Sequence, residues 1–155
     1  MRTITVLEPS FKSLFLSLRF NETELAAGTG FIVQSSKGPL LITNRHNVTG
    51  RNNVTGELLS KNGGTPSEIA IWHNRKESLG QWVKLIEPLF FDDKPLWYEH
   101  PKLGIHADIV ALPLTQTDNI DFYPYDINLA QRILLMPSDI VSVVGFPYVC
   151  LLEED

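Results

Sequence analysis

The chain has 155 residues, 43% hydrophobic and 20% charged, which is typical of one globular domain or of one domain and part of a second. Its net charge of −5, with scattered basic residues, argues against nucleic acid as a partner, because phosphate binding needs clustered Lys and Arg. No run reaches the ~20 apolar residues that span a bilayer, and the single cysteine, Cys150, excludes an internal disulfide.

The N-terminus, MRTITVLEPS, lacks the apolar core and the small-residue cleavage site of a secretory signal. The absence of a disulfide also fits a reducing compartment. We therefore expect a cytoplasmic protein with no membrane partner.

Seven short runs, apolar or alternating and bounded by Gly, Pro, Asn or Asp, predict β-strands. In chain order they are residues 11–20, 28–34, 39–43, 68–73, 81–86, 108–114 and 139–146. Single helical turns are expected at residues 45–48 and 129–134. Because no long segment repeats with a period of 3.6 residues, the predicted fold class is all-β, as a sandwich or a barrel.

The segments between the predicted strands differ in composition. Residues 54–66 and 92–106 are expected to be surface loops, and residues 116–137 a linker, because Asp and Pro interrupt any regular pattern there. Gly28 and Gly30 are interpreted as positions where strands pack closely.

The remaining aromatic and imidazole side chains are given structural roles. His73 and His100 are interpreted as surface residues, and the four histidines share no short spacing typical of a zinc site. Trp72, Trp82 and Trp97 are interpreted as aromatics of the core or of packed loops.

Three motifs occur in order along the chain. Residues 28–48 read GTGFIVQSSKGPLLITNRHNV, a glycine-rich strand, a turn and an apolar strand that ends at His46. Residues 106–112 read HADIVAL and residues 143–147 read VVGFP. Together they resemble the trypsin-like (chymotrypsin-fold) serine peptidases of the bacterial type, whose corresponding segments read Leu-Thr-x-x-His, Asp-(Ile/Val)-Ala-Leu and Val-x-Gly-(Phe/Tyr)-Pro.

The resemblance implies a fold and a chemistry. It implies an antiparallel six-stranded Greek-key barrel over residues 1–115, an inter-barrel linker at 116–137, and the first strand of a truncated second barrel at 138–155. It implies that His46 is the general base and Asp108 the carboxylate that orients it, in the Ser-His-Asp triad of an endopeptidase. The substrate would be a protein or peptide, and no metal or organic cofactor would be required.

The chain departs from the family at the nucleophile. None of its ten serines lies in the family's Gly-x-Ser-Gly turn, so the 155 residues alone are expected to be inactive. A non-catalytic β-barrel binding or scaffold module, or a pseudo-peptidase, stays open as the alternative. His46 could then be a simple hairpin histidine and Asp108 a turn residue, and a His106–Asp108 pair could form a metal or acid–base site.

The C-terminal part carries apolar side chains with no second-barrel partner in the sequence. Residues 134–152 include several such Leu, Ile and Val residues. Because leaving them in water is unfavourable, weak self-association through residues 134–152 is expected.

Overall fold

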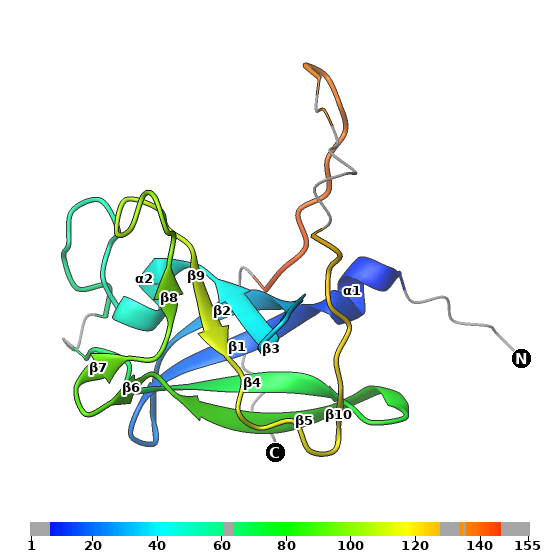
Figure 1. Ribbon diagram of the computed structural model, residues 1–155, viewed down its shortest axis with the longest axis horizontal. Coiled ribbons are helices and arrows are strands. Elements are labelled where there is room, and N and C mark those ends of the chain that lie inside the picture. Colours follow the sequence, from blue (N-terminus) through cyan, green and yellow to red (C-terminus); the bar gives the residue numbers. More distant parts are fainter. Residues whose placement is uncertain (1–6, 61–63, 128–133, 135, 147–155) are drawn as a thin grey trace, which may run out of the picture.

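A single antiparallel sheet dominates the computed structural model, which describes residues 7–60, 64–127, 134 and 136–146 (Figure 1). The longer strands are β1 (Ser13–Phe20), β2 (Thr23–Ser35), β3 (Gly38–Thr43), β4 (Glu68–Arg75), β5 (Ser78–Pro88) and β9 (Val110–Pro113). The shorter elements are β6 (Phe90–Phe91), β7 (Lys94–Pro95), β8 (Tyr98–Glu99), β10 (Ile120–Asp121) and the helices α1 (Glu8–Lys12) and α2 (Arg45–Thr49).

The strands are hydrogen-bonded in the order β10-β4-β1-β2-β3-β9-β8, and β5 pairs with β4. Every ladder between these strands is antiparallel. The pair β3–β9 joins strands distant in sequence, with Thr43 opposite Val110. This pairing matters most for the site, because it brings the end of β3 beside the start of β9.

The core forms on one face of these strands, as the two-residue period of a strand requires. On β1 the buried leucines are Leu14, Leu16 and Leu18, and on β4 the buried isoleucines are Ile69 and Ile71. They pack with Leu41 from β3, Leu112 from β9, Val48 from α2 and Leu89, together with Ile32, Trp97, Val110 and Leu114.

The prediction of an all-β fold is confirmed at the level of class, since antiparallel strands make up most of the regular secondary structure among the described residues. A closed barrel is not seen, because among the described strands no ladder joins β5 to β9. The first strand, predicted to begin at residue 11, begins two residues later, at Ser13. Pro9 lies in the first turn of α1, a position proline favours, and Phe11 and Lys12 are still helical.

Two of the three segments expected to be irregular contain short strands. Residues 92–106 include β7 and β8, and the linker, residues 116–137, includes β10, which pairs Ile120 with Arg75 of β4. Residues 139–146, predicted to be a strand, are part of no ladder in the described structure. The turn expected at 129–134 lies, except for Leu134, outside the described residues, as do residues 147–155.

The interpretation of His73 as a surface residue is wrong. His73 is only 1% exposed, and its ring packs edge-on against Phe122. Burial lowers the pKa of this imidazole to about 4. Trp97 is buried in the core and Trp72 packs against Phe15, as expected, whereas Trp82 is exposed. No helix within the described ranges is long and apolar enough to cross a membrane.

Candidate active site

Helix α2 holds His46 immediately after β3. Asn44, with extended backbone (φ −69°, ψ 144°), precedes the helix, and Gly50 ends it in the left-handed region at φ 63°. The N–H of Gly50 donates to the carbonyl of His46 at 2.9 Å, an arrangement that glycine adopts without strain. Because Asn47 and Val48 of the same helix are buried, the helix packs firmly against the sheet. His46 is then held at the edge of the sheet.

Asp108 reaches His46 because β9 pairs with β3. Oδ2 of Asp108 lies 2.6 Å from Nδ1 of His46, and Oδ1 accepts a 2.9 Å hydrogen bond from the backbone N–H of the same residue. The contact expected between these two residues, 62 positions apart, is therefore present. Two bonds from one carboxylate to one residue fix both the position and the tilt of the imidazole.

Asn44 completes the surroundings of the carboxylate. Its Nδ2 donates to Oδ2 of Asp108 at 3.3 Å and to the Asp108 carbonyl at 3.1 Å. Burial by itself raises the pKa of Asp108, but the hydrogen bonds and charge of His46, with the Asn44 bond, outweigh it and lower that pKa below the ordinary value. Asp108 is consequently ionised at neutral pH.

The ionised carboxylate decides which nitrogen of His46 carries the proton. A carboxylate only accepts hydrogen bonds, so a neutral His46 must carry its proton on Nδ1. The lone pair of Nε2 is then free to accept a proton from another group. Both side chains are partly exposed, so a reacting molecule has access to the pair.

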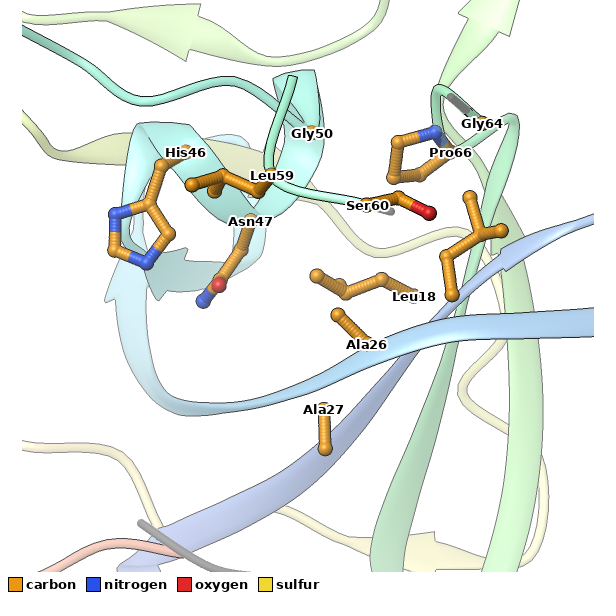
Figure 2. Close-up of a pocket in the computed structure, with 11 residues that line it drawn as sticks. Leu18, Ala26, Ala27, His46, Asn47, Gly50, Leu59, Ser60, Gly64 and Pro66 are labelled. Atoms are coloured by element: carbon orange, nitrogen blue, oxygen red, sulfur yellow. The ribbon is translucent and has the colours of Figure 1, made fainter. Parts of the chain in front are cut away.

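A hollow of about 190 Å³ adjoins the imidazole (Figure 2). Its walls are mainly aliphatic, and it is lined by Leu18, Leu25, Ala26, Ala27, His46, Asn47, Gly50, Leu59, Ser60, Gly64 and Pro66. In Figure 2 the His46 ring lies at one end, and the hydroxyl of Ser60 points away from it. The serine of this hollow is therefore not oriented as a nucleophile toward His46.

Two loops are connected to α2 by hydrogen bonds that no local sequence motif predicts. Nε of Arg45 donates to Oε1 of Glu99 at 2.9 Å, and Nη1 of Arg45 donates to Oδ1 of Asn53 at 3.3 Å. Asn53 in turn donates from Nδ2 to the carbonyl of Ile105 at 3.0 Å. These bonds join the loop after α2 and the loop before Asp108 to the helix that carries His46.

The other candidates are not brought into the site. The carboxylate of Asp108 is engaged by His46 and Asn44, and His106 is exposed. His100 uses Nδ1 to accept from the N–H groups of Lys102 and Leu103. In the part of the chain that the structure describes, no group of three or more His, Cys, Asp or Glu residues is arranged to hold a metal ion.

An imidazole with a free Nε2 and a carboxylate on Nδ1 is suited to general-base catalysis, because the carboxylate stabilises the imidazolium that forms. Comparison of the chain with protein-family models, with curated proteins and with solved structures gives no match.

Proposed function

We propose that this chain supplies the general base and its orienting carboxylate to a serine endopeptidase of the trypsin-like kind. The observation that carries the proposal is the double contact of Asp108 with His46, through Nδ1 and through the backbone N–H. A histidine that only ends a hairpin has no need of a carboxylate bonded to both of these groups.

In the proposed reaction Nε2 of His46 takes the proton of a serine hydroxyl as that oxygen attacks the peptide carbonyl. Asp108 stays ionised and stabilises the imidazolium, which then donates the proton to the leaving amine. The serine and the oxyanion-hole amides would come from sequence beyond these 155 residues, since the chain has no Gly-x-Ser-Gly turn.

We also infer that the sheet curls toward the first barrel of that family. Support comes from Glu87 of β5, which accepts hydrogen bonds from Thr115 and Gln116, immediately beyond β9. Gln116 also donates from Nε2 to the carbonyl of Ile86. These contacts bring β5 and the end of β9 together without a regular ladder.

The test uses the gene with the sequence that follows these 155 codons at its native locus. The expressed protein should be labelled by a serine-directed phosphonate, and His46→Ala or Asp108→Asn should reduce peptidase turnover by about 10⁴-fold. The 155-residue chain itself should show neither labelling nor turnover. Asp118→Asn, at an exposed carboxylate outside the site, is the matched control and should leave the rate unchanged.

The alternative is a non-catalytic β-module or pseudo-peptidase, favoured by the hydroxyl of Ser60, which points away from His46. It predicts that no reading frame downstream encodes a Gly-x-Ser-Gly turn and that the longer protein is not labelled. Either result would contradict the proposed peptidase.

A further inference from the structure

Asn44 occupies the position immediately before α2, where the side-chain oxygen of an asparagine ordinarily accepts a hydrogen bond from one of the first helical N–H groups. The Asn44 side chain makes no such bond. Its amide reaches instead to a residue 64 positions later in the chain: Nδ2 donates to the backbone carbonyl of Asp108 at 3.1 Å and to Oδ2 of the same residue at 3.3 Å. Asn44 therefore does not cap the helix that it precedes.

The capping bond is supplied by Asp108. His46 is the second residue of α2, and its backbone N–H donates to Oδ1 of Asp108 at 2.9 Å. This N–H is one of the two that a capping asparagine would satisfy. The two residues have thus exchanged partners: the carboxylate before β9 caps the helix, and the asparagine that begins the helix holds the carboxylate.

Asp108 needs such a hold, because it lies beyond the regular part of the sheet. The ladder between β3 and β9 ends with Thr43 opposite Val110, two residues after Asp108. The Asp108 side chain is 35% exposed, and with Asn44 it lines a hollow of about 270 Å³. Because solvent competes with His46 for the carboxylate oxygens, burial alone does not secure the orientation of Asp108.

Two bonds from one amide secure that orientation. One holds the backbone carbonyl of Asp108 and the other holds Oδ2, so they lie on either side of the Cα–Cβ bond about which the carboxylate would turn. Rotation about this bond would break the contact of Oδ2 with Nδ1 of His46 and that of Oδ1 with the His46 N–H. Asn44 thereby acts on the imidazole through Asp108.

We propose that Asn44 is a positioning residue that fixes the side-chain rotamer of Asp108, so that the two carboxylate oxygens meet the two N–H groups of His46 together. Its hold on Asp108 follows from contacts within this chain, and only its catalytic consequence rests on the proposed function. A helix cap and a positioning residue need different groups at this position. A cap needs an oxygen that accepts, whereas the positioning role needs the amide that donates.

Asn44→Ser separates the two roles in the 155-residue chain. Serine caps helices as well as asparagine does, but its short hydroxyl does not replace an amide that bonds two groups of Asp108. We expect α2 to stay formed, which the Cα chemical shifts of residues 45–49 would report. The Nδ1 proton of His46 should nevertheless exchange with water about two- to tenfold faster, the range that corresponds to loss of one hydrogen bond.

The carboxyl group of Asp108 supplies a second measurement. The hydrogen bond from Asn44 favours the ionised form and is one of the causes that lower the pKa of Asp108. In Asn44→Ser that pKa should therefore rise toward its ordinary value, as measured from the carboxyl carbon signal during an acid titration. If Asn44 were only a cap, the serine variant would leave this pKa and the exchange of the His46 proton unchanged.

Asn52→Ser is the matched control. Asn52 lies in the loop after α2, and its Oδ1 accepts from the N–H groups of Val54 and Thr55. This substitution should leave the Asp108 titration and the His46 proton exchange as they are in the native chain. If Asn44→Ser alters them no more than Asn52→Ser does, the positioning role is overturned.

The longer protein tests the catalytic consequence. If it is the proposed peptidase, Asn44→Ser should lower kcat about two- to tenfold and leave KM unchanged, since an orienting group acts in the chemical step. An unchanged kcat would overturn the catalytic consequence. A longer protein without peptidase activity would contradict the proposed function alone, because NMR of the 155-residue chain still decides whether Asn44 positions Asp108.

Discussion

The side chain of Asn47 occupies the space directly over Gly28: a Cβ atom at Gly28 would lie 2.7 Å from Nδ2 of Asn47. The same Nδ2 donates to Oγ1 of Thr43 at 2.9 Å, and Thr43 donates to the carbonyl of Thr29 at 2.8 Å. Helix α2, and with it His46, is therefore seated on β2 only because residue 28 has no side chain.

Gly28→Ala should displace α2 and lower the free energy of unfolding by about 1–3 kcal/mol, because a methyl group is forced into occupied space. Thermal or urea unfolding measures the loss, and NMR shifts of the His46 ring report the movement. In an Asn47→Ala background the same substitution should cost less, since the clashing amide is gone. Strictly additive costs in this double-mutant cycle would show that the two residues do not interact.

Asp108→Asn should release the imidazole of His46. The side-chain amide keeps the shape of the carboxylate but lacks its charge and has only one oxygen to accept with, so the double contact with His46 is lost. Nitrogen NMR of the ring should change from one Nδ1-protonated tautomer to a mixture. Asp118→Asn, at an exposed carboxylate, should leave the spectrum of His46 unchanged, and an unaltered tautomer in Asp108→Asn would contradict the proposed role.

The lowered pKa of Asp108 has a pH consequence of defined sign. Its ionised form is favoured by folding, so its contribution to stability is present above the carboxyl pKa of the unfolded chain. That contribution is lost as the pH falls through the lower pKa of the folded state. The stability difference between the native chain and Asp108→Asn should therefore narrow in acid, as urea titrations at several pH values would measure.

His73 should destabilise the protein in mild acid. The pKa of the buried ring is about 4 against an ordinary 6.5, so below pH 6.5 the unfolded chain takes up a proton that the folded chain does not. The resulting loss should reach roughly 3 kcal/mol near pH 4. His73→Leu should remove this pH dependence, whereas His106→Gln, at an exposed ring, should retain it. An unchanged slope in His73→Leu would show that another group is responsible.

Glu87 should stabilise the chain where it leaves β9. Its buried carboxylate accepts from the N–H of Thr115 at 2.7 Å, from the Thr115 hydroxyl at 2.7 Å and from the N–H of Gln116 at 2.9 Å. Glu87→Ala leaves these donors without an acceptor and should cost about 2–4 kcal/mol. Amide hydrogen exchange at residues 115 and 116 should accelerate, while Glu22→Ala, at an exposed carboxylate, should change neither quantity.

Two incorrect predictions have identifiable causes. The alternation in β4 places Ile69, Ile71 and His73 on one face, so the two-residue period already indicated that His73 is buried. The interpretation of His73 as a surface residue relied on the polarity of histidine and not on this two-residue period. For residues 139–146 the β-branched composition was correctly read as a tendency to form a strand, but a strand exists only when another strand accepts its hydrogen bonds.

Local patterns determined the all-β class, the hairpin that ends at His46 and the run that begins at Asp108, because turn residues and alternation act over a few neighbouring positions. The resemblance of the motifs implied that these two residues meet, but only the tertiary structure shows what brings them together. Their contact depends on β3 pairing with β9 in the register that sets Thr43 opposite Val110, and on Gly28 admitting Asn47 beneath α2. Register between distant strands is set by packing of the whole core, since a slip of one residue would turn every side chain to the opposite face.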